Sequence, residues 1–110
     1  MNSSKPVEFL GTSLRDLKDF PFTARQEAGY QIDRVQRGME PTDWKPMPTI
    51  GIGVREIRIH EVNGAFRVIY LAKLADAVFI LHCFQKKTQK TSDLDLEIAS
   101  KRYRDLIRGR

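Results

Sequence analysis

The sequence has little cysteine, little histidine and no long apolar run. Among its 110 residues, Cys83 is the one cysteine, and His60 and His82 are the two histidines. A lone cysteine cannot form an intramolecular disulfide or a cysteine-based zinc site. Two histidines are too few for a convincing metal site without carboxylates at fixed spacing. We therefore expect no metal and no cofactor, and a reducing cytoplasm is the sensible compartment.

The longest apolar run, residues 77–81, has the length of a strand. Residues 1–9 contain no long apolar stretch, so we expect neither a signal peptide nor a membrane-spanning helix there. Hydrophobic residues make up 41% of the chain, which is enough for an ordinary folded interior. The length fits one compact domain, which we expect to span residues 1–110.

The charge is unbalanced toward the positive side. There are 19 lysines and arginines against 14 aspartates and glutamates, a formal net charge of +5. Such an excess favours an anionic partner, and nucleic acid is the commonest case. On its own this is weak evidence, because many small basic proteins bind no nucleic acid.

The first third of the chain predicts a short edge strand and two helices. The strand is expected at residues 7–10. Ser13 followed by Asp16 has the form of a helix N-cap with an acidic residue three positions on, so a short helix should begin there. Apolar residues at helical spacing predict a second helix over residues 22–37, and Gly38 is a natural stop. The two helices would form a helical hairpin.

The rest of the chain predicts three antiparallel strands and a last helix. Residues 41–48 contain three prolines and read as an irregular connector. Strands are expected at residues 54–62, 65–72 and 77–84, with Asn63-Gly64 as a two-residue hairpin loop. Ser92 with Asp95 predicts the start of the C-terminal helix. The fold class is therefore α+β, with helices packed on an antiparallel sheet.

The hairpin loop sets a register for the first two strands. With Asn63-Gly64 as the loop, His60 lies opposite Arg67, and Arg58 lies opposite Ile69. These four side chains then share one face of the sheet. The other face carries the apolar positions, which are Ile57, Ile59, Val68 and Tyr70.

The third strand extends the same face if Leu71 lies opposite Val78. Arg67 would then also lie beside His82, although a slip of one residue would turn His82 to the other face. In this register His60, Arg67 and His82 form a row across the sheet. The cations around that row are Arg58, Lys86, Lys87 and Lys90.

Such a cationic row could bind a phosphodiester and stabilise the added charge of its transition state. RNA carries its own nucleophile, the 2′-hydroxyl group. A protein then needs to align that oxygen, remove its proton, neutralise the phosphorane and protonate the 5′-oxygen. The sequence offers no carboxylate cluster for a metal-dependent alternative.

Structural roles are also open for most of these residues. A mid-strand arginine such as Arg67 is often one member of a structural ion pair, and a lone histidine on a strand is more often structural than catalytic. The run of lysines from Lys86 to Lys90 could be a solvated loop. Tyr103 falls on the apolar stripe of the last helix, which favours core packing.

Four segments resemble the phage-derived branch of the RelE/HigB toxin superfamily, and the resemblance extends over nearly the whole chain. The segments are SLRDLKDFP (13–21), VREIR (54–58), FRVIY (66–70) and VFILHCFQKKT (78–88). The resemblance implies an α+β fold like that of microbial ribonucleases, with N-terminal helices on a small curved antiparallel sheet and a C-terminal helix. It implies metal-independent cleavage of messenger RNA, typically on the ribosome. It also implies a helix-turn-helix antitoxin encoded next to the chain, through which alone the chain would reach operator DNA.

The resemblance also assigns roles. Arg67 matches the family's second-strand arginine, which binds the scissile phosphate, and Arg58 lies where basic residues help to activate the 2′-hydroxyl. Lys86 and Lys87 match the basic pair that stabilises charge after the last strand. Relatives often place a tyrosine or histidine near the C-terminus to contact the substrate. Tyr103 is the C-terminal tyrosine here, and its place on an apolar stripe leaves the general acid open.

Three hypotheses follow. The first is that the chain is an RNA endonuclease toxin. Its catalytic residues would be Arg58, Arg67, Lys86 and Lys87. The residues that contact the RNA would be His60, His82, Lys90 and Tyr103. The second is a catalytically weak or inactive member that acts as a binding module in a repressor complex. The third is a phage-encoded modifier of a host protein. A pocket that gathers the catalytic cations favours the enzyme, whereas cations splayed apart or paired with internal carboxylates favour the module.

Overall fold

The computed structural model describes residues 4–110, so the first three of residues 1–9, where we expect no signal peptide, lie outside the described range. Within this range the chain is α+β, as predicted. Its elements in chain order are β1 (Val7–Phe9), α1 (Ser13–Lys18), α2 (Phe22–Gln36), β2 (Trp44–Pro46), β3 (Val54–Glu61), β4 (Gly64–Leu71), β5 (Val78–Lys86) and α3 (Asp93–Arg108).

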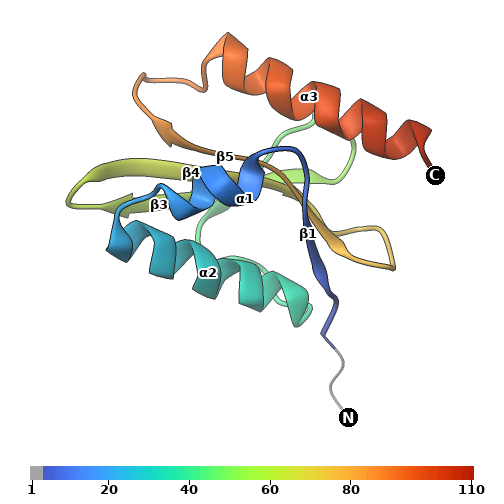
Figure 1. The fold of residues 1–110 in the computed structure, drawn as a ribbon, viewed down its shortest axis with the longest axis horizontal. Coiled ribbons are helices and arrows are strands. Elements are labelled where there is room, and N and C mark those ends of the chain that lie inside the picture. The colour runs from blue at the N-terminus through green and yellow to red at the C-terminus, as the bar shows by residue number, and fades with distance from the viewer. Residues whose placement is uncertain (1–3) are drawn as a thin grey trace.

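The strands form one sheet in the order β1-β5-β4-β3-β2. Strands β3, β4 and β5 are antiparallel neighbours, as expected from the sequence. Strand β1 pairs with β5 in parallel, so the sheet is mixed rather than wholly antiparallel. Helices α2 and α3 lie on opposite sides of the sheet (Figure 1), and Leu17 of α1 belongs to the same apolar core as α2.

Each face of the sheet has its own apolar core. The core under α1 and α2 includes the four positions that alternation predicted, Ile57, Ile59, Val68 and Tyr70. The core under α3 contains residues of β4 and β5 together with Ala99 of the helix. Both faces of β4 and β5 are therefore covered, which explains why these strands are apolar at both parities.

The N-cap predicted from the sequence is confirmed for α3 and is wrong by one residue for α1. At α3 the backbone N–H of Asp95 donates to Ser92 Oγ at 3.1 Å, so the predicted N-cap is confirmed. At α1 the N-cap is Thr12 rather than Ser13. The Ser13 side chain is buried and its hydroxyl donates to the carbonyl of Ile80 at 3.3 Å, because the helix begins against β5.

The predicted register of the β3–β4 hairpin is wrong by two positions. Glu61 pairs with Gly64, so the loop residues are Val62 and Asn63 rather than Asn63 and Gly64. The Asn63-Gly64 loop requires positive φ at both residues. Gly64 has a φ of 131° but Asn63 does not adopt positive φ. Because the shift is two positions, every side chain keeps its predicted face.

The predicted β4–β5 register is also wrong. Ile69 pairs with His82, whereas Leu71 pairs with Phe79 and not with Val78. A bulge in β5 lies between these two pairs and adds one residue to the strand. The pairing of Leu71 is displaced by one residue from the prediction, and the bulge adds a second residue, so His82 lies opposite Ile69 rather than beside Arg67.

The connector at residues 41–48 is not wholly irregular. Trp44–Pro46 forms the edge strand β2, which pairs Lys45 with Glu56 of β3. Proline is tolerated there because an edge strand has one side free of ladder hydrogen bonds. Across residues 4–110, no helix has the length and apolar character needed to cross a membrane.

Candidate nucleic-acid site

The predicted site residues of the sheet lie on the face that α3 partly covers. The cross-strand rows on β3, β4 and β5 are His60–Ala65–Lys86, then Arg58–Arg67–Phe84, then Glu56–Ile69–His82. The predicted single row of His60, Arg67 and His82 is therefore wrong, because the three residues lie in successive rows. They still share one face.

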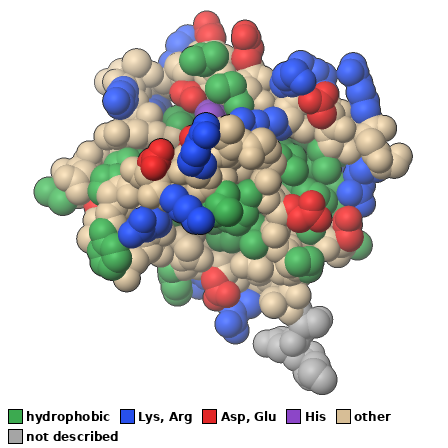
Figure 2. All heavy atoms as spheres, viewed as in Figure 1, with side chains coloured by type: hydrophobic (Ala, Val, Ile, Leu, Met, Phe, Trp, Pro, Cys, Tyr) green, Lys and Arg blue, Asp and Glu red, His purple; other side chains and the backbone are tan. Residues whose placement is uncertain are grey.

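A depression of about 490 Å³ lies where β4 begins and β5 ends, and six residues line it: Ala65, Arg67, Lys86, Lys87, Thr88 and Gln89. It brings together three of the four predicted catalytic residues. Arg58 lies directly opposite Arg67 on the neighbouring strand but does not line the depression. On the face seen in Figure 2, lysine and arginine side chains are scattered rather than gathered in one patch.

Arg67 reaches the depression from a buried position. Its side chain is 5% exposed, and Nη1 donates to the carbonyl of Phe66 at 3.0 Å. Its Nε lies 3.6 Å from Oε1 of Glu56. Burial lowers the pKa of Arg67, and the charge of Glu56 opposes that shift. Arg67 keeps its charge, because an arginine guanidinium is not deprotonated in proteins.

Glu56 is a residue that the sequence reasoning missed. Its side chain is 0% exposed, and Oε2 accepts a hydrogen bond from Thr91 Oγ1 at 3.1 Å. Lys45 Nζ of β2 lies 4.0 Å from its Oε1. A signal was present, because strand alternation places this glutamate on the same face as Arg58 and Arg67.

Arg58 also has an acidic partner that was not foreseen. Its Nε lies 3.1 Å from Oδ1 of Asp43, and its backbone N–H donates to the carbonyl of Asp43 at 2.9 Å. The side chains of this pair are 38% and 44% exposed, so solvent and ligands can reach both. Asp43 directly precedes β2, whose formation the sequence did not predict.

Lys86 and His60 flank Ala65 at the edge of the depression. Burial lowers the pKa of Lys86, and the charge of Arg67 lowers it further. An ammonium group with a lowered pKa is a better proton donor at neutral pH. His60 and Lys87 are exposed and therefore accessible to a ligand.

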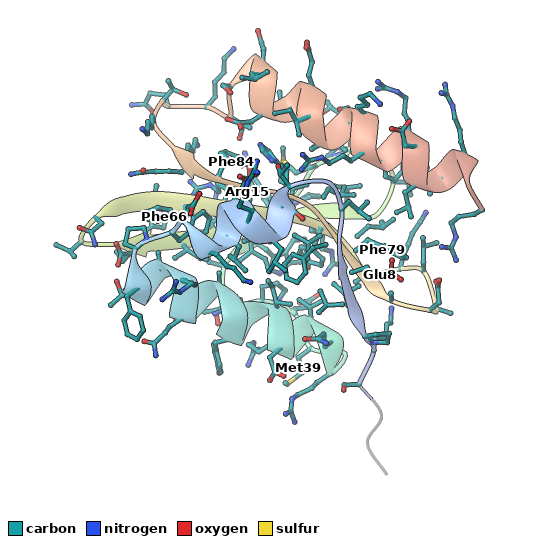
Figure 3. The ribbon with its side chains drawn as sticks, viewed as in Figure 1. Glu8, Arg15, Met39, Phe66, Phe79 and Phe84 are labelled. Atoms are coloured by element: carbon teal, nitrogen blue, oxygen red, sulfur yellow. The ribbon has the colours of Figure 1, made fainter. Side chains whose placement is uncertain are left out.

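His82 has a mainly structural setting. Its Nε2 lies 2.7 Å from Oδ1 of Asp95, which links β5 to the first turn of α3. Its ring stacks on that of Phe84 (labelled in Figure 3), with the ring centroids 5.0 Å apart. His82 does not line the depression.

The two remaining predicted residues are not brought to the depression. Lys90 is exposed in the loop before α3 and does not line the depression. Tyr103 packs on the apolar core under α3, with its ring against Gly51, where an added Cβ would lie 2.3 Å from a ring carbon. Among residues 4–110, no three His, Cys, Asp or Glu side chains are grouped as a metal site requires.

Comparison with known proteins gives one match to a family. The family described as "Phage derived protein Gp49-like (DUF891)" matches residues 15–104, which include Arg58, Arg67, Lys86 and Lys87. No curated protein matches the chain. The family match spans well over half of the sequence, from α1 into the last turns of α3. The chain belongs to the Gp49-like family of phage-derived proteins.

Proposed function

We propose that this chain is the toxin of a type II toxin–antitoxin pair and an endoribonuclease that cleaves messenger RNA. The observation that carries the proposal is the depression in which Arg67, Lys86 and Lys87 converge. Three cations around one hollow suit a phosphodiester and the extra charge of its transition state. Membership of a phage-derived family and the resemblance to RelE/HigB toxins support the same function.

The proposed reaction is transfer of the phosphate to the neighbouring 2′-oxygen. The 2′-oxygen loses its proton and attacks phosphorus, and the bond to the 5′-oxygen breaks. The products are a 2′,3′-cyclic phosphate and a free 5′-hydroxyl group. The protein aligns the groups, moves two protons and neutralises the phosphorane.

The geometry supports distinct roles in that reaction. Arg67 holds the scissile phosphate, and Lys87 adds positive charge from the loop. Lys86 donates the proton to the 5′-oxygen, since its lowered pKa favours proton release. Arg58 lies opposite Arg67, and the exposed His60 lies in the same cross-strand row as Lys86. Both act near the 2′-hydroxyl.

The proposed cellular setting follows from the same resemblance. The substrate is messenger RNA on the ribosome, and Lys90 would contact the RNA backbone from its exposed loop. A helix-turn-helix antitoxin encoded next to the chain keeps it silent. The chain contacts operator DNA only through that antitoxin.

A binding module in a repressor complex is the second candidate, and one observation favours it. Arg67 faces Glu56 and Arg58 faces Asp43, so both sheet arginines already have an internal carboxylate. A module of this kind would keep the fold and the partner but would cut no RNA.

The deciding experiment is to induce the chain alone, and then with its upstream and downstream neighbours, while growth is followed and new 5′ ends on cellular transcripts are mapped. Growth arrest with cuts inside coding regions, relieved by one neighbour, supports the toxin. Soluble protein that produces neither arrest nor new ends refutes the nuclease and favours the module.

The choice of variants follows from the burial of the site. Arg67→Ala is a poor single probe, because it leaves Glu56 buried without its nearest cation. Arg67→Lys and the double variant Lys86→Ala/Lys87→Ala are better, and both should abolish the cuts. Lys73→Ala is the matched control, because Lys73 is exposed and does not line the depression.

A further inference from the structure

Three buried side-chain polar atoms have no hydrogen-bond partner within residues 4–110, and all three belong to residues on the face of the sheet that carries Arg58 and Arg67. They are Glu56 Oε1, Arg67 Nε and His82 Nδ1. Two of them face each other, because Oε1 of Glu56 lies 3.6 Å from Nε of Arg67. Buried polar groups in native proteins are nearly always hydrogen-bonded, so such a pair at a proposed site requires an explanation.

Glu56 is contacted from three different elements. Thr91, in the segment before α3, donates to its Oε2. Lys45 of β2 and Arg67 of β4 both approach its Oε1. The Glu56 carboxylate therefore connects the edge strand β2, Arg67 in the depression and the loop between β5 and α3. Because its side chain is wholly buried, it does not touch a ligand in the depression.

We infer that Glu56 is a positioning residue, which sets the orientation of the Arg67 guanidinium and its affinity for phosphate. Its charge attracts the guanidinium from behind, and the Thr91 hydroxyl keeps the carboxylate in place. The predicted effect of Glu56 on RNA turnover rests on the proposed nuclease function. Its predicted effect on the position of Arg67 and on phosphate binding does not.

Two opposite consequences follow from this arrangement. A negative charge 3.6 Å from Arg67 Nε competes with a bound phosphate, so Glu56 weakens anion binding. The same charge holds the guanidinium in one position, so Glu56 favours the in-line geometry that the reaction requires. A residue with a merely structural role would affect binding and turnover in the same direction through loss of folded protein.

Glu56→Gln tests the inference, because glutamine keeps the shape and an oxygen that can accept from Thr91. Glu40→Gln is the matched control: it removes the same charge from an exposed residue paired with Arg55 at 3.5 Å. Inorganic phosphate is titrated into each protein while the Nε–H signal of Arg67 is followed by ¹⁵N NMR. The signal is assigned by its loss in Arg67→Lys.

In Glu56→Gln we expect the Arg67 signal to move before phosphate is added, and phosphate to bind severalfold more tightly. With RNA as substrate we expect kcat to fall by about tenfold or more without a rise in KM. Glu40→Gln should match the wild type in all these measurements. An unchanged Arg67 signal together with an unchanged phosphate Kd in Glu56→Gln would overturn the inference. If the wild-type protein cuts no RNA, the proposed function fails, but the signal and the phosphate titration still decide the role of Glu56.

A second pair of variants covers the case in which Glu56→Gln does not fold. Thr91→Val removes the hydroxyl that holds Glu56, and Thr91→Ser retains it. We expect the Arg67 signal to move in Thr91→Val and to keep its wild-type position in Thr91→Ser. The same position in both variants would refute the link from Thr91 through Glu56 to Arg67.

Discussion

Arg58 and Arg67 are direct cross-strand partners on β3 and β4, and each faces a different carboxylate. Like charges directly opposite each other destabilise a sheet. Here Asp43 screens Arg58 from the solvent side, and Glu56 screens Arg67 from within the protein. The two carboxylates differ in burial, so their removal should have different effects.

Asp43→Asn should increase the affinity for RNA a few-fold, because it frees the half-buried Arg58 beside the depression. The change in unfolding free energy should be small, since exposed ion pairs contribute about 0–1 kcal/mol. The affinity is measured on a short RNA at several salt concentrations, and the salt dependence should become steeper. Asp33→Asn breaks the exposed pair between Asp33 of α2 and Arg37, the C-cap residue of that helix; it is the control and should leave the affinity unchanged.

Arg67→Ala should lower the free energy of unfolding by about 3 kcal/mol, because it leaves a buried carboxylate without its nearest cation. Adding Glu56→Gln to this variant should recover part of the loss. Urea denaturation of the single and double variants measures both values. Equal stability of the two variants would show that the charge of Glu56 is not the source of the loss.

Ser92→Ala should lower the free energy of unfolding by about 1 kcal/mol, because it removes the side-chain acceptor of the Asp95 backbone N–H. Ser100→Ala, inside the same helix, is the control and should not destabilise the protein, since alanine is the better helix former. Thermal unfolding followed by circular dichroism compares the two variants.

Tyr103→Phe should retain RNA cleavage, because the ring packs on the apolar core under α3 and not on the depression. Tyr103→Ala should instead reduce stability by about 3 kcal/mol through the cavity that it leaves. Cleavage rates at equal concentrations of folded protein separate the two effects. A large loss of kcat in the phenylalanine variant would assign the hydroxyl to the reaction.

Cys83 should resist alkylation in the native protein, because burial raises the pKa of its thiol to about 12. The thiolate is the reactive species, and at pH 8 only about 10⁻⁴ of such a thiol is ionised. Raising the pH increases the thiolate fraction, so labelling by iodoacetamide should accelerate with pH. Mass spectrometry of labelling with and without urea checks this, and rapid labelling of the folded protein at pH 8 would contradict it.

The faces of the strands could be predicted from the sequence, but their pairings could not. Alternation has a period of two, so a register error of two positions left Arg58 and Arg67 on the correct face. The bulge in β5 has no glycine or proline to mark it, since residues 80–82 are all ordinary strand residues. The N-cap of α3 was readable because Ser92 and Asp95 are three residues apart.

The cations of the candidate site were predictable from the sequence, whereas the contacts made by its carboxylates, Glu56 and Asp43, were not. Arg58 and Arg67 could be placed on one face from strand periodicity, and Lys86 was expected near them because it follows the last predicted strand. The contact between Glu56 and Thr91 joins residues 35 positions apart, and that between Asp43 and Arg58 joins residues 15 positions apart. Such contacts depend on the docking of α3 and on an edge strand that local patterns do not reveal.

Helices α2 and α3 differ in how many of their residues are buried. Helix α2 has five buried residues, which are Ala24, Ala28, Gln31, Ile32 and Val35. In α3 the buried residue is Ala99. Local opening of an element requires less free energy when less of it is buried, so the amide protons of α3 should exchange with solvent before those of α2. Transient release of α3 would bring Glu56 and His82 to the surface while the core beneath α1 and α2 stays folded.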